Sequence, residues 1–412
     1  MALNYIWVAF FLISFLIALC KLVILGDTEV FKTVVEGLFD SSKVAVMDIA
    51  LPLAGVMTFF LGLLNIAEKV GAISLLARVI GPFFNQLFPE VPKNHPANGQ
   101  MIMNFSANML GLDNAATPFG LKAMQSLQEL NPQKDTASNA QIMFLVLHTS
   151  GLTIIPLSIM AQRAILGAAD PSDIFIPCLI GTYVTTVCSV AIVAVKQRLN
   201  LLNGIVLGWL GGITAFLGLA LWYLSALPPE QIRQVSNVVG NVLLFSIIAS
   251  FLVGAVVRKI DLFDTFIDGA KSGFETSVRI IPYLVGMLVA IGAFRNAGAM
   301  DFLVGGLKYL FGLTGINTDF TDALPVALMK PLSGSGARAL MIDAMKQFGP
   351  DSFVGRLVCI FQGSADTTFY IVALYFGSVG IKKTRYAIVA GLIADFVGVL
   401  AGIGLGYLFF HD

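Results

Sequence analysis

The chain has 412 residues, of which 57% are hydrophobic and 12% are charged, and its formal net charge at pH 7 is zero. Soluble domains carry roughly 25% charged residues, and the mean hydropathy of +0.85 is high, so we predict an all-α polytopic membrane protein in the lipid bilayer. The neutral balance argues against nucleic acid as a partner. The four cysteines occur singly, without Cys-x-x-Cys spacing, so we expect no disulfide framework and no metal site.

Apolar runs long enough to span a bilayer recur along the chain, about 20 residues being needed for each crossing. The first run, residues 4–25, predicts a retained helix, because it lacks the basic leader and small-residue cleavage site of a signal peptide. Residues 72–88 contain Gly81 and Pro82, which favours a re-entrant hairpin or an interfacial helix. The other expected spans are residues 44–64, 140–165, 172–196, 201–226, 235–257, 279–297, 355–377 and 384–409.

Residues 97–131 alternate small, amide and apolar side chains, a pattern that a lipid-facing helix would not carry. We predict an interrupted helix that faces a cavity, with Gly111 and Pro118 as the expected breaks. A helix N-cap is the alternative role for Asp113. The polar side chains are Asn104, Asn108, Asp113, Asn114 and Thr117.

The stretch 330–370 carries charge and glycine into otherwise apolar sequence, and ionisable groups at membrane depth are functional candidates by default. Its small-residue run precedes an expected half-helix that ends near Gly349. The backbone N–H groups of the run would bind an anion, although close helix packing is the alternative. The run consists of Ser333, Gly334, Ser335 and Gly336.

Arg338 follows this run and has two candidate roles. It would hold a carboxylate or phosphate of a substrate bidentately, or it would form an internal ion pair with Asp343 or Asp366. The half-helix N-terminus adds partial positive charge to the guanidinium. In both cases an anionic group is the expected guest.

A second polar run lies in the span 355–377 and supplies oxygen ligands of the kind that Na⁺ prefers. Its members are Gln362, Ser364, Asp366, Thr367 and Thr368. Interhelical hydrogen bonding is the alternative, at about 0.6–2 kcal/mol per contact. His148 lies at the matching place of the first half and suits proton coupling, with a packing role as its alternative. The coupling ion is therefore Na⁺ or H⁺, and the residues do not choose between them.

The two halves of the chain repeat each other weakly but in order. In the second span of each half, Gly55 matches Gly286 and Asn65 matches Asn296. In the polar spans, Ser150 of the first half matches Ser364 of the second, and Thr153 matches Thr367. We predict a first repeat in residues 1–200, a linking helix and loop in residues 201–234, and a second repeat in residues 235–412. Because the linking helix adds one crossing, the repeats should be inverted.

Loop charges give the expected orientation through the positive-inside rule, which places the N-terminus in the cytoplasm. The face of the N-terminus would carry Lys196, Arg198, Arg258, Lys259, Lys271, Lys382, Lys383 and Arg385. The opposite face would carry Lys21, Lys32, Lys43, Arg163 and Arg233. The bias is modest, and we expect a multi-pass protein of the bacterial cytoplasmic membrane.

Two segments carry a family resemblance. Residues 331–395, beginning PLSGSGARALMIDAMKQFGPDSFVGRLVCIFQGSADTTFYIV, resemble spore maturation protein B. NMLGLDNAATPFGLKAMQSLQELNP (108–132), with AEKVG (67–71), resembles spore maturation protein A. The chain is thus similar to a fusion of the two, in the nucleoside-recognition (Gate) domain group, which is related to the membrane part of ferrous-iron transporter B and to concentrative nucleoside transporters. The resemblance implies inverted repeats with re-entrant hairpins and broken helices around a midplane site.

The sequence holds no phosphate-binding loop, HExxH or GxSxG motif, so we expect no enzyme activity and no catalytic residues. Our main hypothesis is a secondary transporter that binds a small polar or anionic metabolite between the inverted repeats. Its pocket would combine the Ser333–Gly336 run and Arg338 with Asn108, Asp113, Asn114, Ser150 and Thr153. The alternatives are a nucleoside transporter and a non-transporting membrane factor in envelope or spore maturation. Whether the chain forms a homo-oligomer stays open.

Overall fold

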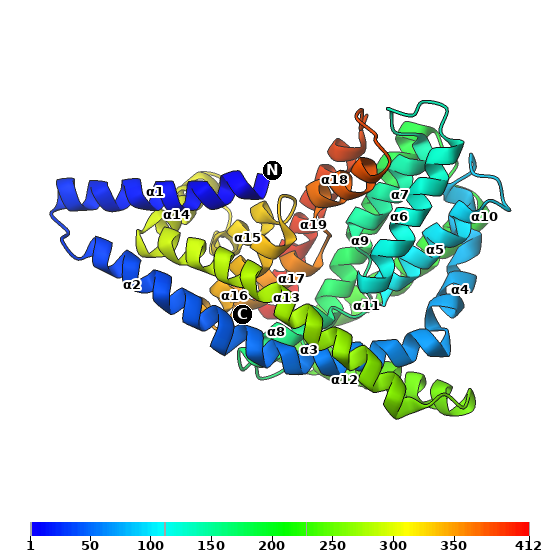
Figure 1. Cartoon of the computed structure of the whole chain (residues 1–412), viewed down its shortest axis with the longest axis horizontal. Coiled ribbons are helices and arrows are strands. Elements are labelled where there is room, and N and C mark those ends of the chain that lie inside the picture. The colour runs from blue at the N-terminus through cyan, green and yellow to red at the C-terminus, as the bar shows by residue number, and fades with distance from the viewer. Residues whose placement is uncertain (1, 111–112, 228, 412) are drawn as a thin grey trace. The chain divides into compact units, whose positions relative to one another are not determined.

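The computed structural model describes residues 2–110, 113–227 and 229–411, and within these ranges every named element is a helix (Figure 1). Within these described ranges, seven helices are long and apolar enough to cross a membrane, or up to eight if one bent pair counts as a span. The seven are Tyr5–Leu25, Val30–Val70, Phe175–Gln197, Gly204–Leu224, Val238–Val257, Phe353–Ser378 and Ala387–Phe410. The prediction of an all-α polytopic membrane protein is confirmed.

The chain forms two compact units, and each takes segments from both halves of the sequence. Unit 1 comprises Met1–Leu61, Ser158–Pro171 and Ala270–Gln362. Unit 2 comprises Gly62–Leu157, Ser172–Gly269 and Gly363–Asp412. Such interleaving is consistent with two repeats that exchange segments, while the boundaries expected for the repeats stay a prediction.

Unit 1 contains long apolar helices and a region of short helices. Its elements are α1 (Ala2–Leu25), α2 (Val30–Lys43), the π-helical η1 (Val44–Ala50), the first part of α3 (Leu51–Val70), most of α8 (Leu157–Ile165), most of α13 (Leu262–Asn296), α14 (Ala299–Gly312), the 3-10 helix η3 (Asp319–Ala323), α15 (Leu324–Met329), α16 (Gly334–Phe348) and α17 (Phe353–Gly363). Gly298, at a φ of 87°, separates α13 from α14, and these two helices bend by 71°. The half-helix expected to end near Gly349 corresponds to α16, which ends at Phe348.

Unit 2 is built around a buried apolar cluster that includes Phe84, Met101, Phe144 and Phe376. Its further elements are α4 (Ala72–Leu87), α5 (Pro96–Met109), α6 (Asp113–Leu130), α7 (Asn139–Ser150), α9 (Phe175–Gln197), α10 (Gly204–Val206), the π-helical η2 (Leu207–Gly211), α11 (Gly212–Ser225), α12 (Pro229–Val257), α18 (Thr368–Ser378) and α19 (Ala387–Phe410). Large apolar side chains thus hold the helices of this unit together through close van der Waals packing.

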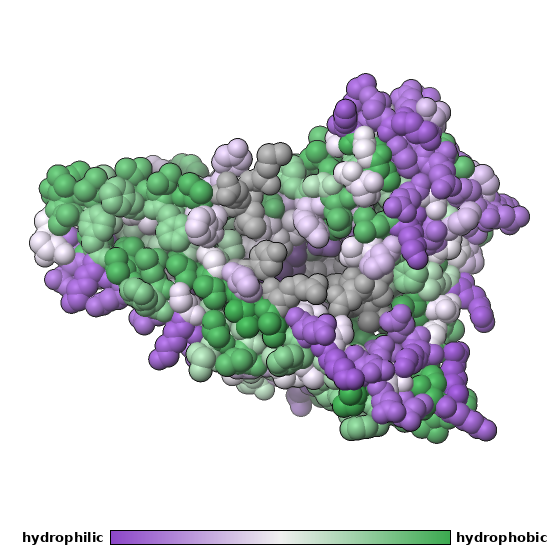
Figure 2. Space-filling view, in the orientation of Figure 1, coloured by the Kyte–Doolittle hydropathy of each residue, from purple (hydrophilic) through white to green (hydrophobic). Residues whose placement is uncertain are grey.

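The outer surfaces match a lipid environment. Figure 2 shows hydrophobic side chains along α1, where Leu12, Phe15 and Val23 are each more than half exposed. Hydrophilic residues gather at the loops beyond the ends of α6 and α7 in the same view. A row of exposed apolar side chains on a helix of spanning length is what the bilayer core requires.

Two expected breaks are absent from the described helices, and one expected span is broken. No break occurs at Gly81 and Pro82, because α4 continues through both residues, and Pro118 lies inside α6. In both helices buried side chains lie on either side of the proline, so packing outweighs a backbone loss of about 3 kcal/mol. Conversely, residues 140–165 do not form one continuous helix, because the chain leaves helical geometry after Ser150. Gly111, the other expected break, lies outside the described residues.

Candidate functional site

Two interrupted helices meet at their breaks inside unit 2. One break lies between α7 and α8, residues 151–156, and the other lies between α17 and α18, residues 364–367. The backbone N–H of Asp366 donates to the carbonyl oxygen of Thr149 over 2.8 Å. Gly151 caps α7 at a φ of 61°, and a Cβ there would lie 3.0 Å from the Asp366 nitrogen. Glycine is therefore required both by the left-handed backbone and by the close approach.

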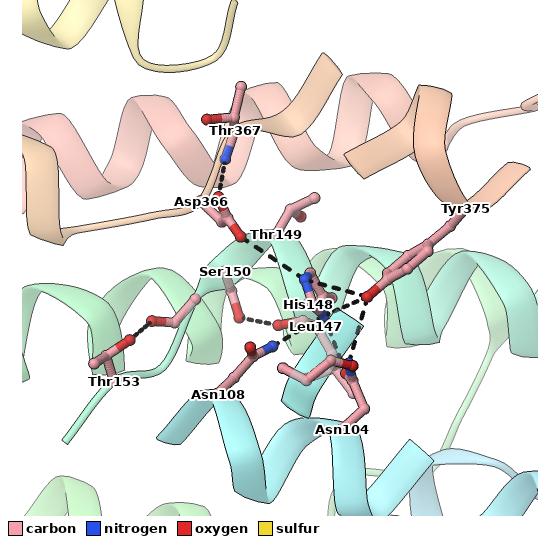
Figure 3. Close-up of polar contacts among 12 residues, drawn as sticks. Asn104, Asn108, Leu147, His148, Thr149, Ser150, Thr153, Asp366, Thr367 and Tyr375 are labelled. Carbon is pink, nitrogen blue, oxygen red and sulfur yellow. Dashed lines mark hydrogen bonds and ion pairs between the residues drawn. The ribbon is translucent and has the colours of Figure 1, made fainter. Parts of the chain in front are cut away.

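His148, in the last turn of α7, is the centre of a buried polar cluster (Figure 3). Its Nδ1 lies 3.0 Å from Asn104 Oδ1 and 2.9 Å from Asn108 Nδ2, and its Nε2 lies 3.8 Å from Asp366 Oδ2. A protonated Nδ1 donates to Asn104, whereas an unprotonated Nδ1 accepts from Asn108. The amides therefore satisfy Nδ1 in either tautomer, and the doubly protonated ring has the Asp366 carboxylate at ion-pair distance from Nε2.

Tyr375 of α18 closes one side of this cluster. Its hydroxyl oxygen lies 3.4 Å from His148 Nδ1 and 3.4 Å from Asn104 Nδ2, and its ring stacks on Phe144 with centroids 5.7 Å apart. Gly120 of α6 provides the room, since a Cβ there would overlap the Tyr375 hydroxyl oxygen. We did not single out Tyr375 from the sequence, because an aromatic residue in an apolar span carries no distinguishing signal.

The predicted hydroxyl residues of the two breaks mostly bond within the protein. Ser150 Oγ lies 2.9 Å from Thr186 Oγ1 of α9, Thr153 Oγ1 donates to the Gly151 carbonyl oxygen over 2.8 Å, and Thr367 N–H donates to Asp366 Oδ1 over 2.7 Å. The structure thus brings Asn108, His148 and Asp366 together and places Ser150 and Thr153 at the adjoining break. Their roles in binding stay predictions.

Other predicted site residues lie apart from this cluster or beyond description. The side chains of Asp113 and Asn114 lie outside the described residues. Gln362 ends unit 1 and is buried, and its Oε1 has no hydrogen-bond partner within the described part of the chain. Ser364 and Thr368 are buried in unit 2.

Asp395 is a polar residue of the interior that we did not select from the sequence. It is 6% exposed, lies in the membrane-spanning helix α19, and accepts a hydrogen bond from Thr368 Oγ1 over 2.7 Å. The signal was present, because it is the single charged residue among residues 387–410. The predicted sites were runs of several polar residues, and an isolated carboxylate does not form such a run.

The Ser333–Gly336 run in unit 1 begins α16, as expected. Ser333 Oγ accepts the Gly336 N–H over 3.0 Å, and a Cβ on Gly336 would lie 3.1 Å from Met287 and 3.2 Å from Met329. The cap and the tight packing account for both residues, so the structure supports the packing alternative at Gly336. An anion at this N-terminus stays a prediction.

Arg338 is partly buried on α16, and the structure assigns Asp343 to a different cation. Asp343 forms an ion pair with Arg295 of α13. Since Arg338 and Asp343 are five residues apart on one helix, their side chains point about 140° apart. Helix geometry therefore does not favour the Arg338–Asp343 pair, and the partner of Arg338 stays a prediction.

The Arg295–Asp343 pair lines a charged cavity of about 190 Å³ in unit 1. Lys308 and Asp322, whose charged atoms are 2.8 Å apart, form a second pair in its wall, and Asp301 also faces it. The amino-acid sequence gives no sign of this cavity, because its charges come from α13, α14, η3 and α16, which are separate in the chain.

Arg163 is the other departure from expectation. We counted it as a loop charge, but its side chain is 0% exposed. It donates to the Pro350 carbonyl oxygen over 2.5 Å and to Asp351 Oδ1 over 3.0 Å. It therefore fastens residues 163–170 to the loop after α16, and it does not act as a solvent-facing orientation signal.

Comparisons with known proteins agree with this architecture. A family model described as nucleoside recognition, the Gate domain, matches residues 50–166 and 277–382. Spore maturation protein B of Bacillus subtilis (strain 168) is 46% identical over 164 residues, which cover 40% of this chain and 90% of that protein. Spore maturation protein A of the same organism is 36% identical over 189 residues, which cover 46% of this chain and 92% of that protein. No solved structure shows significant similarity.

The two relatives are each covered almost completely, and the family model spans more than half of this chain. The resemblance noted in the sequence is therefore confirmed, together with the membrane character. The chain belongs to the Gate, or nucleoside-recognition, family of membrane proteins and unites sequences homologous to spore maturation proteins A and B.

Proposed function

We propose that this protein is a secondary transporter for a small polar or anionic metabolite. The observation that carries the proposal is the meeting of two helix breaks at a buried polar cluster, with Asp366 N–H bonded to the Thr149 carbonyl oxygen. Non-helical backbone at membrane depth is tolerated where it is buried in protein or lines a water-filled cavity. Binding sites of repeat-built transporters use such breaks.

An exposed carboxylate next to a buried imidazole supports the proposal. The Asp366 side chain is 44% exposed, whereas that of His148, which lies next to it, is 4% exposed. The carboxylate therefore can meet a polar ligand or a proton, and the imidazole behind it can accept that proton. Asn108, Ser150 and Thr153 would contribute amide and hydroxyl contacts to a ligand.

Within unit 1, Arg338 and the N-terminal run of α16, Ser333–Gly336, would bind an anionic group. The orientation with a cytoplasmic N-terminus, a place in the bacterial cytoplasmic membrane and the absence of any catalytic step belong to the same proposal. The relatives of bacterial origin support that membrane.

Flux measurements in proteoliposomes test the proposal. A panel of organic anions, amino acids and nucleosides should include at least one substrate whose flux exceeds that of empty liposomes. Asp366→Asn should reduce this flux at least tenfold, and Thr314→Val, at an exposed loop position, should leave it unchanged. Equal fluxes with and without folded protein for the whole panel would contradict transport.

Two other functions are supported by the comparisons. The names of both relatives favour a non-transporting membrane factor in spore or envelope maturation, and the family description favours nucleosides as cargo. The same panel separates these functions. Flux of nucleosides alone identifies a nucleoside transporter, and no flux with any compound favours the non-transporting factor.

A further inference from the structure

The helix α19 carries one carboxylate into a helix that is otherwise apolar. Asp395 is 6% exposed, and the hydroxyl of Thr368, at the first position of α18, donates to its Oδ2 over 2.7 Å. A carboxylate at this depth is costly to keep ionised unless a cation or several hydrogen bonds compensate it. The surroundings of Asp395 therefore indicate what compensates the charge.

Two glycines of α19 bring oxygen-bearing side chains close to Asp395. A Cβ on Gly391 would lie 3.1 Å from Thr368 Oγ1. A Cβ on Gly398 would lie 2.6 Å from Thr185 Oγ1 and 3.5 Å from Ser364 Oγ. Since Gly391 and Gly398 lie one turn before and one turn after Asp395, hydroxyls from α9, α18 and the break 364–367 flank the carboxylate.

A fourth hydroxyl lies at the level of the carboxylate. Gln197 Nε2 donates to the Tyr386 hydroxyl over 2.8 Å, and together with the approach of Gly398 to Thr185 this shows that α9 and α19 run antiparallel. In that register Ser189 of α9 lies about level with Asp395. Ser189 is 0% exposed and its Oγ has no hydrogen-bond partner within the described part of the chain.

The orphaned hydroxyl is unusual for its helix. Thr182, Thr185 and Thr186 each donate to a backbone carbonyl of α9, as hydroxyls in apolar helices commonly do. Ser189 makes no such bond. An unsatisfied buried oxygen about level with a buried carboxylate provides oxygen ligands of the kind that a cation needs.

We propose that Asp395 is the anionic ligand of a buried Na⁺ site, with Thr368, Ser189 and Ser364 as hydroxyl ligands. Na⁺ is a hard cation that prefers oxygen, and one carboxylate with several hydroxyls balances its charge. This assignment keeps two residues of the run expected to bind Na⁺, Ser364 and Thr368, but replaces Asp366 by Asp395. It deepens the proposed transport function, because bound Na⁺ would link α19 to the break 364–367.

Ion binding is tested without transport, on the purified full-length protein. The melting temperature is followed as NaCl replaces choline chloride at constant ionic strength. A ligand that binds only the folded state raises the melting temperature with its concentration, so wild type should show an increase with Na⁺. Asp395→Asn should abolish it, and Thr368→Val should weaken the apparent affinity at least tenfold.

Thr182→Val is the matched control, since its hydroxyl bonds within α9 and it should keep the wild-type Na⁺ response. If Asp395→Asn does not fold, Ser189→Ala and Thr368→Val carry the test. The proposal is overturned if Asp395→Asn keeps the Na⁺ response or if Asp366→Asn alone loses it. It is also overturned if the melting temperature of wild type depends on pH but is the same in NaCl and in choline chloride. Na⁺ binding without any flux would contradict transport and leave this site in place.

Discussion

Gly120→Ala is a direct perturbation of the polar cluster. A Cβ at this position of α6 would overlap the Tyr375 hydroxyl oxygen and lie 2.5 Å from Tyr375 Cζ and 2.8 Å from Asn104 Nδ2. Tyr375 is fully buried and stacks on Phe144, so its rigid ring cannot move aside freely. The substitution must displace Tyr375 from His148 or shift α6.

The expected cost follows from two opposing contributions. Overpacking of a well-packed interior typically destabilises by about 1–3 kcal/mol, while alanine in a helix interior stabilises by about 0.5–1 kcal/mol relative to glycine. We expect a net destabilisation of about 1–2 kcal/mol, measured as the free energy of unfolding in mixed detergent micelles. Gly99→Ala in α5 is the control, since nothing lies within 4 Å of a Cβ there, and it should be neutral or stabilising.

A double-mutant cycle locates the cause. Tyr375→Leu shortens the opposing side chain, so the combined variant should be at least about 0.5 kcal/mol more stable than the two single costs predict. Additive costs, or a Gly120→Ala variant as stable as Gly99→Ala, would refute the close packing of Gly120 against Tyr375. Transport by Gly120→Ala should also decrease, because His148 loses its neighbour.

Three further predictions address the charged or titratable side chains of Arg163, Asp135 and His148. Arg163→Ala should lower the free energy of unfolding by about 3 kcal/mol. This is the lower end of the range for a broken buried ion pair, because the partner carboxylate of Asp351 is 35% exposed. Thermal stability close to that of wild type would contradict this expectation. Hydrogen bonds from Thr136 and Lys383 hold the pKa of Asp135 below its ordinary value of 3.8. The ionised carboxylate therefore contributes to the stability of the fold above pH 3.8, and this contribution is lost as pH falls further. Melting temperatures of wild type and an Asp135→Asn variant should therefore converge below that pH, and a constant difference would exclude the effect. His148→Gln should flatten the pH dependence of flux between about pH 5 and 8, and an unaltered profile would remove the imidazole from proton coupling.

The membrane class could be predicted because it depends on composition and run length alone. Backbone groups in lipid must be satisfied internally, so an apolar run of about 20 residues has few alternatives to a helix. The break after Ser150 is a harder case. Gly151 and Pro156 were visible in the run 140–165, but glycine and proline also occur inside helices, as Pro82 and Pro118 do here. Only the approach of Asp366 to Gly151 decides between these outcomes.

The candidate site was partly predictable for a similar reason. The matching runs around Ser150 and Ser364 pointed to the polar region, because several polar residues together are rare in a span, but not to the break after Ser150. Asp395 and Arg163 were missed or misplaced because one charge carries no local signal of its burial. For Arg163, the partners at Pro350 and Asp351 lie almost half the chain away, and no periodicity reports such a contact.

The two units fasten loops of opposite halves in a similar way, and this bears on which part of the molecule can move. In unit 1, Arg163 binds the loop that follows Gly349-Pro350. In unit 2, the N–H groups of Lys382 and Lys383 both donate over 2.9 Å to the carbonyl oxygen of Asp135, in the loop that follows Asn131-Pro132. Each of the two loops follows an X-Pro pair, Gly349-Pro350 in one and Asn131-Pro132 in the other.

Each broken helix is therefore anchored at its outer ends, by an ion pair or by backbone hydrogen bonds between the halves. Within the breaks the chain has no helical ladder, and the contact from Asp366 N–H to the Thr149 carbonyl oxygen is a hydrogen bond of the ordinary kind, worth about 0.5–1.5 kcal/mol net. Local opening is least costly where fewest bonds must be lost. Conformational change should consequently concentrate at residues 151–156 and 364–367, next to His148 and Asp366, which is where a transported ligand or a coupling ion would have to enter and leave.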